Sequence, residues 1–326
     1  MTKAAPLLTL LLLAACSSTP PAAPPSTPAP APAPAPDPAF QALFPPNAAI
    51  EKLASGFQFI EGPLWLPGDR LLFSDVPGNV VHQWSAEGNT VKEFLRPSEN
   101  SNGLLAGPNN SLLLCQHSGR RVALRSPSGV ITTLTDRFEG RKLNSPNDAV
   151  YHSDGSLYFT DPPYGLDKQD DDPGKELAFN GVYRLAQGKL QLLSKELSRP
   201  NGIALSPDEK FLYVANSDAA RKLWMRYPVL PDGSLGPGRV FADVTAEKAD
   251  GLPDGLKVDE KGNLWATGPG GVWVFSPEGK HLGTLKPAEV PANVAFGGPD
   301  GKTLYMTART GLYRIATTVA GKKAVY

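Results

Sequence analysis

From Glu61 onward, the chain repeats one pattern of polar and apolar positions six times. Each copy begins with a polar residue and an apolar run, passes through a loop of Asp, Asn, Gly or Pro, and ends with a second apolar run. Short apolar runs bounded by turn residues are typical of β-strands. The copies are EGPLWLPGDRLLFSD from Glu61, NGLLAGPNNSLLLCQ from Asn102, NDAVYHSDGSLYFTD from Asn147, NGIALSPDEKFLYVAN from Asn201, DGLKVDEKGNLWATG from Asp254 and NVAFGGPDGKTLYMTA from Asn293.

Two more strands usually follow each copy, as in GVYRLAQ and KLQLLSK, which flank a turn at Gly188. Four antiparallel strands that recur about every 40 to 55 residues predict an all-β fold, a six-bladed β-propeller with four-stranded antiparallel blades. Ring closure protects the sheet edges, so we expect the last blade to take a strand from each terminus. Either residues 50–59 or the final AGKKAVY could supply the closing strand.

The polar residue that opens each copy has a common position in this fold. The first strand of a propeller blade lies nearest the central channel, so its opening residue points toward the axis at one rim. Asn-Gly and Asp-Gly are also common turn dipeptides, and a turn explains any single pair equally well. Six oxygen-bearing side chains in register favour a ring instead. Its expected members are Glu61, Asn102, Asn147, Asn201, Asp254 and Asn293.

A ring of carboxylate and amide oxygens suits a hard divalent cation, above all Ca²⁺, which takes roughly six to eight oxygen ligands. Glu61 and Asp254 would neutralise the ion, while Asn201 and water complete its coordination shell. The ring contains no Cys or His, which argues against a site that selects zinc or copper. The alternative is a solvated polar channel without a metal.

The links that follow the second strands and those that precede the first strands lie at the same rim as the ring. His117 is a candidate proton shuttle, because a His titrates near neutral pH, although a structural role is the simpler interpretation. Residues 162–180 form the longest link, which is either a lid over the rim or a solvated loop. The candidate residues of this rim are His117, Arg141, Lys142, Asp161, Tyr164 and Asn216.

The N-terminal segment differs in composition from the repeats. Its apolar stretch is too short to span a bilayer and ends in Leu-Ala-Ala-Cys, which resembles a bacterial lipobox with Cys16 as the lipidated residue. Ser17 favours sorting to the outer membrane, with the domain facing the periplasm or the cell surface. The predicted segments of this exported lipoprotein are a signal peptide at residues 1–15, a Pro- and Ala-rich linker at 16–38 and the propeller at 39–326.

Charge and cysteine content narrow the expected partners. Lys and Arg number 32, Asp and Glu also number 32, and no basic run occurs, so we expect no nucleic-acid partner. With Cys16 used for lipid, Cys115 has no intramolecular disulfide partner and is predicted to be a buried strand thiol. We expect membrane contact through the lipid anchor only, and a monomer.

The chain also carries four specific motifs, namely GPLW after Glu61, NSPNDAVYHSDGSLYFTDPPYG, RPNGIALSPD and PDGLKVD. They resemble the gluconolactonase, regucalcin and luciferin-regenerating-enzyme family, also called the senescence marker protein family, and are closest to bacterial gluconolactonases. The resemblance implies a six-bladed propeller with one divalent metal, usually Ca²⁺, on its axis. It also implies that Glu61, Asn201 and Asp254 are metal ligands, and that Asn147 contacts the substrate and the metal-bound water.

One position departs from that family. Animal members have an Arg two residues before the Asn that corresponds to Asn147, where it contacts the sugar, whereas this chain has Ser145. Arg141 or Lys142 could supply a charge from nearby. The departure affects the identity of the substrate more than the chemistry.

The resemblance to this family, whose members commonly hydrolyse sugar lactones, implies a metal-dependent hydrolase that opens sugar (aldono-) lactones. The metal, most simply Ca²⁺ but alternatively Zn²⁺, Mg²⁺ or Mn²⁺, would polarise the ring carbonyl and acidify a water molecule. Asp254 would be both metal ligand and general base, and Asn147 would be the second catalytic residue. The expected substrate-binding residues are Asn102, His117, Arg141, Asn147 and Tyr164.

Two other functions are compatible with the same residues. One is phosphotriester hydrolysis at the same site, in which Asp254 or water attacks phosphorus. The other is a non-catalytic, surface-tethered binding propeller with a structural cation, whose rim captures a glycan or a protein. A retained metal without lactone hydrolysis would favour the binding propeller.

Overall fold

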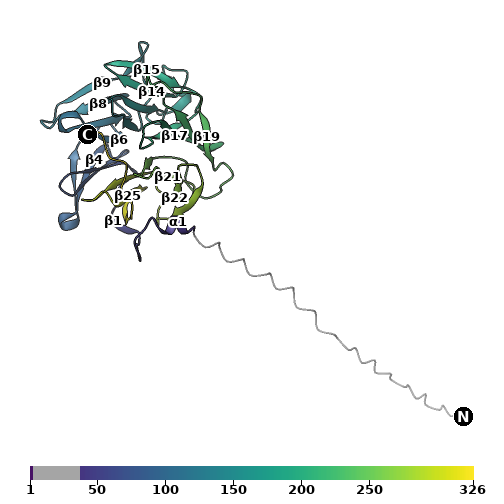
Figure 1. Ribbon diagram of the computed structural model, residues 1–326. Helices are drawn as coiled ribbons and strands as arrows, with labels where there is room; N and C mark the ends of the chain where they lie inside the picture. Colours follow the sequence, from purple (N-terminus) through teal and green to yellow (C-terminus); the bar gives the residue numbers. More distant parts are fainter. Residues whose placement is uncertain (3–36) are drawn as a thin grey trace. The chain divides into compact units, whose positions relative to one another are not determined.

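Six antiparallel sheets of four strands each surround a central channel within residues 37–326 of the computed structural model (Figure 1). The structure describes residues 1–2 and 37–326. The first strands of neighbouring sheets contact one another, which places them around the channel. The predicted six-bladed β-propeller with four-stranded antiparallel blades is confirmed. Cys16 and nearly all of the predicted signal peptide and linker lie outside the described residues, and these assignments stay predictions.

Each blade runs outward from the channel through strands that are consecutive in the chain, except in the last blade. Blade 1 contains β2 (Ile60–Leu66), β3 (Arg70–Asp75), β4 (Val80–Ser85) and β5 (Thr90–Leu95), and blade 2 contains β6 (Ser101–Gly107), β7 (Ser111–Gln116), β8 (Arg121–Arg125) and β9 (Ile131–Thr135). Blade 3 contains β12 (Ala149–Tyr151), β13 (Leu157–Asp161), β14 (Gly181–Ala186) and β15 (Lys189–Ser194), and blade 4 contains β16 (Pro200–Leu205), β17 (Phe211–Asp218), β18 (Arg221–Pro228) and β19 (Arg239–Asp243). Blade 5 contains β20 (Leu256–Val258), β21 (Leu264–Gly268), β22 (Gly271–Phe275) and β23 (His281–Leu285), and blade 6 contains β24 (Asn293–Gly297), β25 (Thr303–Ala308), β26 (Gly311–Ala316) and β1 (Glu51–Ser55).

Short elements complete the described chain. A two-stranded hairpin of β10 (Arg137–Phe138) and β11 (Arg141–Lys142) lies between blades 2 and 3 in sequence. The helices are α1 (Pro38–Gln41), η1 (Glu87–Asn89), η2 (Pro108–Asn110) and η3 (Gln169–Asp171). None of the helices in the described part of the chain has the length and apolar character of a membrane span.

The hydrophobic core lies between the blades as well as within them. Trp65 of β2 stacks on Tyr305 of β25, with ring centroids 5.1 Å apart. Tyr158 of β13 shares one buried cluster with Leu212 and Val214 of β17. Because adjacent blades bury apolar side chains against each other, each repeat depends on its neighbours for its core. Cys115 in β7 is a buried free thiol, as predicted.

The N-terminal strand closes the propeller. Strand β1 pairs antiparallel with β26 and forms the outer strand of blade 6, while β24, β25 and β26 come from the C-terminal part of the chain. Of the two candidates, residues 50–59 therefore provide the closing strand. Preceding residues strengthen this closure, since Phe40, Leu43 and Phe44 pack into the core of the last blades.

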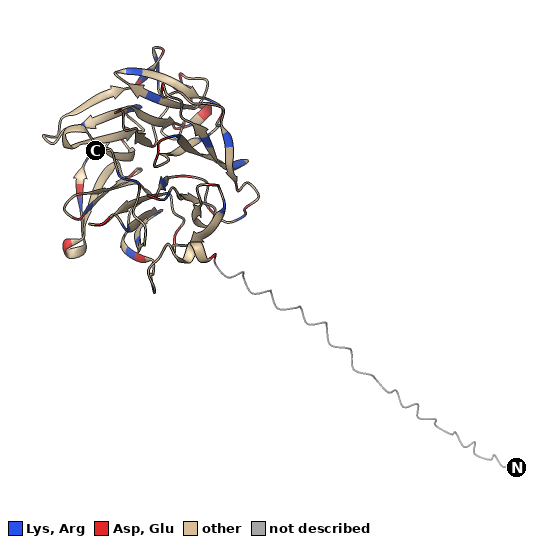
Figure 2. Ribbon diagram, viewed as in Figure 1, with Lys and Arg blue, Asp and Glu red and all other residues tan. Residues whose placement is uncertain are grey.

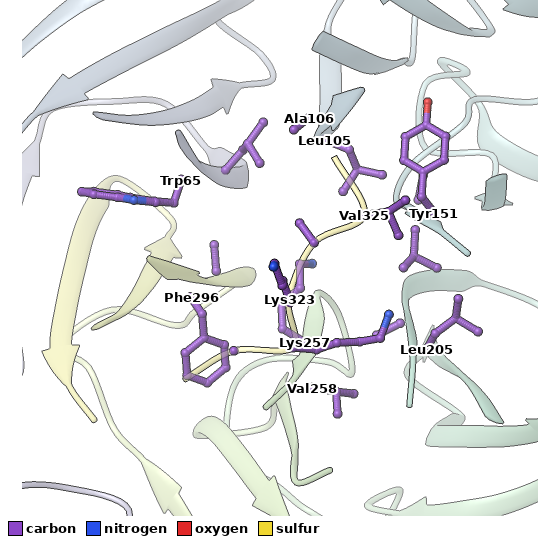
Figure 3. A pocket seen from close by; sticks show the side chains of 18 of the residues that line it. Trp65, Leu105, Ala106, Tyr151, Leu205, Lys257, Val258, Phe296, Lys323 and Val325 are labelled. Carbon is purple, nitrogen blue, oxygen red and sulfur yellow. The ribbon is translucent and has the colours of Figure 1, made fainter. Parts of the chain in front are cut away.

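The C-terminal residues 321–326 have a different place, at a cavity of about 200 Å³ that we call the lower cavity (Figure 3). Inner strands of all six blades line it, through apolar side chains such as Trp65, Tyr151 and Phe296. The tail is anchored by Lys322, whose Nζ lies 3.0 Å from Glu209 Oε1. The last residue, Tyr326, packs edge to face on Tyr151 with ring centroids 4.9 Å apart.

Positions of both charge signs are scattered along the ribbon. Lys and Arg positions are interspersed with Asp and Glu positions over the blades (Figure 2). Many pair locally, as Arg96 does with Glu93 at 2.8 Å and Arg314 with Glu51 at 2.8 Å. This distribution matches the equal numbers of basic and acidic residues in the sequence.

Candidate active site

Five of the six predicted ring residues line one cavity of about 310 Å³ in the channel, which we call the upper cavity. The sixth, Asn293, lies behind Glu61 and donates from Nδ2 to Glu61 Oε2 at 2.9 Å. The size is in the range of small-molecule sites. The polar walls are formed by Glu61, Asn102, His117, Asn147, Tyr164, Asn201, Ser217 and Asp254, and the apolar walls by Phe59, Val76, Pro77 and Leu252.

Glycines beside the ring explain why the blades converge there. A Cβ atom on Gly202 would lie 2.2 Å from the carbonyl oxygen of Asp254, and one on Gly62 would lie 2.0 Å from that of Asn102. Contacts this short exclude any side chain, so the inner strands can approach only through glycine. Because Asn201 and Gly202 lie within β16, this Asn-Gly pair is part of a strand and not a turn.

Hydroxyl groups on the second strands fasten the ring to the next blade. Ser74 Oγ donates to the carbonyl oxygen of Asn102 at 2.8 Å, and Thr160 Oγ1 donates to that of Asn201 at 2.7 Å. Each bond crosses from one blade to the following one. The backbones of Asn102 and Asn201 are therefore fixed by the preceding blade as well as by their own, which restricts where their side chains can point.

Glu61 and Asp254 share the upper cavity as two desolvated carboxyl groups. Burial raises the pKa of Glu61 to about 7, against the hydrogen bonds that its Oε2 accepts from Gly62 N at 2.8 Å and from Asn293. Burial, followed by the nearby Glu61 carboxylate, raises the pKa of Asp254 well above its usual range. Two carboxylates placed this close repel each other when ionised, and a cation between them removes that repulsion.

The donor set of this cavity matches a hard cation. Asp254 Oδ1 and Asn102 Oδ1 are buried and accept no hydrogen bond from any group that the structure describes. Unpartnered buried oxygens are costly unless a ligand satisfies them. The carboxylate and amide oxygens of Glu61, Asn102, Asn201 and Asp254 are the kind that Ca²⁺ takes, so the residues present fit the implied metal.

Ser217 orients Asn201, and the sequence analysis did not include it. Asn201 Nδ2 donates to Ser217 Oγ at 2.9 Å, and Ser217 Oγ donates to the carbonyl oxygen of Pro253, the residue before Asp254. With its amide nitrogen occupied in this way, Asn201 is free to use Oδ1 for a ligand. The signal in the sequence is the Ser or Thr near the end of the second strand, which recurs in FSD, FTD and ATG.

His117 and Tyr164 lie in the wall of the upper cavity. Nε2 of His117 is 3.5 Å from Nδ2 of Asn147, and burial lowers the pKa of His117 to about 4. The imidazole is therefore neutral near pH 7, so it acts as a hydrogen-bonding group. Burial also raises the pKa of Tyr164, which keeps its hydroxyl protonated.

Comparison with known proteins identifies the family. Residues 59–310 match the model of the SMP-30/Gluconolactonase/LRE-like region. The chain belongs to the SMP-30/gluconolactonase/LRE-like family. The gluconolactonase of Zymomonas mobilis is 37% identical over 303 residues, which cover 86% of this chain and 84% of that protein. The 6-deoxy-6-sulfogluconolactonase of Pseudomonas putida is 34% identical over 261 residues, 76% of this chain and 82% of that protein.

Solved structures of the family show the same architecture. A gluconolactonase from Xanthomonas campestris superposes with a TM-score of 0.78 at 32% identity, over 86% of this chain and 93% of that chain. A calcium-binding regucalcin from Agrobacterium tumefaciens has a TM-score of 0.69 at 22% identity, over 84% of this chain and 95% of that chain, and its likeness shows the fold. The resemblance predicted from the four motifs is thus confirmed.

Ser145, at which this chain departs from the animal members of the family, faces away from the upper cavity. Its Oγ donates to the carbonyl oxygen of Pro162 at 2.6 Å and accepts from Gly165 N at 2.8 Å. Asp161 accepts the backbone N–H groups of Asn144 and Ser145, each at 2.8 Å. These bonds fix the turn that carries Tyr164 into the cavity wall.

The rest of the link at residues 162–180 is fastened to the rim by its own polar groups. Asp170 is paired with Arg199, and Glu176 Oε2 accepts Lys142 N at 2.7 Å. Of the two predicted alternatives, lid or solvated loop, neither describes the segment completely. Tyr164 lines the upper cavity, and η3 with its neighbours is exposed and tied to the adjacent loops.

Four of the predicted rim residues do not line the upper cavity, and one of them is Asp161, whose carboxylate instead holds the backbone of Asn144 and Ser145. Arg141 and Lys142 are exposed on the β10–β11 hairpin, where Arg141 Nη1 lies 3.5 Å from the carbonyl oxygen of Glu176. Asn216 is buried but accepts from Arg199 N at 2.8 Å and donates to the carbonyl oxygen of Arg221 at 2.9 Å. The structure therefore brings together the ring, His117 and Tyr164, but not Arg141.

Proposed function

We propose that this gluconolactonase-family hydrolase opens sugar (aldono-) lactones at a single divalent cation, most simply Ca²⁺, in the upper cavity. The observation that carries the proposal is the pair of desolvated carboxylates, Glu61 and Asp254, which face amide oxygens in a cavity of small-molecule size. The gluconolactonase of Zymomonas mobilis and the sugar-lactone hydrolase of Pseudomonas putida, both more than 30% identical, support the substrate class.

Glu61, Asn201 and Asp254 would hold the cation. When bound there, a divalent cation supplies Lewis-acid polarisation of the lactone carbonyl. Glu61 keeps its orientation through the bonds from Gly62 and Asn293, and Asn201 keeps its own through Ser217. The protein thus positions its oxygens before the substrate arrives, which is the main requirement for stabilising a developing charge.

Asp254 is the general base of the proposed reaction. Its Oδ1 has no hydrogen-bond donor in the described protein and takes the proton of the attacking water. The water oxygen bonds to the carbonyl carbon, the C–O bond of the lactone ring breaks, and the proton on Asp254 passes to the departing oxygen. One water and one lactone give one hydroxy acid, and Asp254 returns to its starting state.

The remaining polar walls position the substrate. Asn147 Nδ2 and the neutral His117 ring are placed to hydrogen-bond the lactone and the water. Asn102 and Tyr164 line the same space and offer an amide oxygen and a protonated hydroxyl to the sugar. Near-attack positioning by such groups contributes to rate without any proton transfer of their own.

The test is hydrolysis of a panel of aldonolactones by the purified protein before and after chelation, with Ca²⁺, Zn²⁺, Mg²⁺ or Mn²⁺ added back. Turnover should disappear on chelation and return with one or more of the ions. Full activity after complete metal removal would contradict the role of the cation. A folded, metal-loaded protein that hydrolyses no lactone would contradict the hydrolase proposal and favour phosphotriester hydrolysis or a binding propeller.

A further inference from the structure

Asp148 places a third carboxylate in the channel, next to the ring. It follows Asn147 at the position where four other copies have glycine, and it is 3% exposed. Its Oδ1 accepts the backbone N–H of Ala149 at 2.9 Å, whereas Oδ2 is buried and accepts no hydrogen bond from the residues that the structure describes. A buried carboxylate in this condition requires positive charge nearby.

Lys257 supplies that charge from the neighbouring part of the channel. It is the middle residue of β20, and its Nζ lies 3.8 Å from Asp148 Oδ2 and donates to the carbonyl oxygen of Leu256 at 3.0 Å. Its side chain also lines the lower cavity, among apolar residues such as Leu205 and Val258 (Figure 3). The Asp148–Lys257 ion pair therefore lies between the ring and the lower cavity.

The ion pair affects the pKa values of the ring carboxylates. Burial is the main cause of the raised pKa of Glu61, Asp148 raises it further, and Lys257 lowers it. Asp148 likewise adds to burial and to Glu61 in raising the pKa of Asp254. The ion pair is thus close enough to change the electrostatic potential at the ring.

The charges near the ring indicate a specific role for the Asp148–Lys257 ion pair. Glu61, Asp254 and Asp148 are three carboxylates, and Lys257 neutralises one of them. With a cation bound, Glu61 and Asp254 would both be ionised, so two uncompensated negative charges stay at the ring, which equals the charge of one divalent ion. Without Lys257, the channel would present three negative charges to a cation.

We propose that Lys257 sets the affinity and the charge selectivity of the cation site by neutralising Asp148, so that the ring presents two carboxylates to one divalent ion. The inference rests on the proposed function in one respect, which is that a cation binds at the ring. Lys257 and Asp148 are not ligands in this account. They act on the bound ion through their charge.

Two single variants test the inference because their effects have opposite signs. Lys257→Met removes the positive charge and keeps an unbranched apolar side chain against the lower cavity. Asp148→Asn removes the negative charge, keeps the shape and keeps an acceptor for Ala149. We expect the Kd for Ca²⁺ to fall about tenfold in Lys257→Met and to rise about tenfold in Asp148→Asn. The double variant should lie within about threefold of the wild type.

The experiment is calorimetric titration of the metal-free protein with Ca²⁺ and, in a second series, with Tb³⁺. Lys257→Met should improve the Kd for Tb³⁺ more than that for Ca²⁺, since three carboxylates attract a trivalent ion more strongly. Lys323→Met is the matched control, because Lys323 also lines the lower cavity but is exposed, and it should leave both constants unchanged. Thermal unfolding of each variant checks that the protein used in each titration is folded.

The outcomes separate the two proposals. Suppose that the wild type binds one ion. Weaker cation binding in both single variants, or unchanged cation binding in all variants, would then overturn the proposed role of Lys257. A wild-type protein that binds no cation would overturn this inference together with the metal-dependent function. If Lys257→Met does not fold, Asp148→Asn and the double variant still test the proposal. Only a charge effect predicts that Asp148→Asn binds Ca²⁺ more weakly and that the double variant recovers the wild-type Kd.

Discussion

At the residue scale, the two ring carboxylates differ in how the protein holds them. Glu61 Oε2 accepts hydrogen bonds from Gly62 N and Asn293 Nδ2, so its orientation is fixed. Asp254 Oδ1 accepts none from the described part of the chain. A fixed carboxylate is suited to holding an ion throughout turnover, whereas an oxygen without a donor is suited to accepting a proton. The structure therefore supports different roles for two residues of similar chemistry.

Substitution should separate these roles. Asp254→Asn is expected to lower kcat by about 10² to 10⁴-fold even at saturating Ca²⁺, because the amide cannot accept the proton. Glu61→Gln is expected to raise the Kd for Ca²⁺ by about 100-fold, because the site loses one of its charges, and to recover much of its kcat when the ion is saturating. Steady-state kinetics across a Ca²⁺ titration measures both. Near-normal turnover by Asp254→Asn would show that another group is the base.

At the element scale, the site depends on the links that precede the first strands and on those that follow the second strands. The turn after β13 carries Tyr164 and is fixed by Ser145, whose Oγ bonds to Pro162 and Gly165. The β10–β11 hairpin, by contrast, turns Arg141 toward solvent. Both links are close in sequence to the inner strand β12, but only the turn after β13 contributes a side chain to the upper cavity. The difference lies in the hydrogen bonds each link makes, which residue type alone does not predict.

Removing the Ser145 hydroxyl should affect substrate binding more than chemistry. Ser145→Ala is expected to lower stability by about 1–3 kcal/mol and to raise KM, because the turn that places Tyr164 loses both of its bonds to Oγ. Ser206→Ala is the matched control, since the Ser206 hydroxyl also makes two hydrogen bonds, to Asp208 and from Phe211 N, but does not line the upper cavity. The control should lose similar stability with an unchanged KM. Equal KM values in both variants would exclude the positioning role.

At the scale of the whole molecule, the two ends of the described chain act in different places. Strand β1 completes blade 6 at its outer edge. The C-terminal tail lies at the lower cavity, where Val325 packs against the core cluster around Tyr151 and Lys322 pairs with Glu209. Closure by β1 involves a strand ladder with one register shift between Lys52 and Ala54, and the tail contributes a smaller set of contacts.

Deletion of residues 321–326 should therefore weaken the propeller without disabling it. The expected change is a fall in Tm of about 5 °C, from the loss of the Lys322–Glu209 pair and the packing of Val325 and Tyr326. The kcat at 25 °C should stay unchanged, because the tail does not line the upper cavity. Thermal unfolding and lactone hydrolysis of the shortened protein measure both quantities. An unchanged Tm, or a lost kcat, would contradict this assignment.

The sequence by itself determined the fold class, the number of blades and the five ring residues that line the upper cavity. These features follow from local periodicity, since an apolar run between turn residues forms a strand wherever it occurs, and six copies in register place equivalent residues at equivalent points. For this reason the repeat pattern alone selects Glu61, Asn147, Asn201 and Asp254. The glycine after four of the ring residues is also visible in the sequence, although its cause, the close approach of inner strands, is not.

Only the tertiary structure decided which segment closes the propeller, which rim residues reach the upper cavity and which residue neutralises Asp148. The pairing of β1 with β26, the contact of Ser217 with Asn201 and Pro253, and the ion pair of Asp148 with Lys257 each join residues that the repeat pattern does not relate. Such contacts depend on the twist and spacing of neighbouring blades. Local propensity does not encode these distances, because they arise only when all six blades pack around one axis.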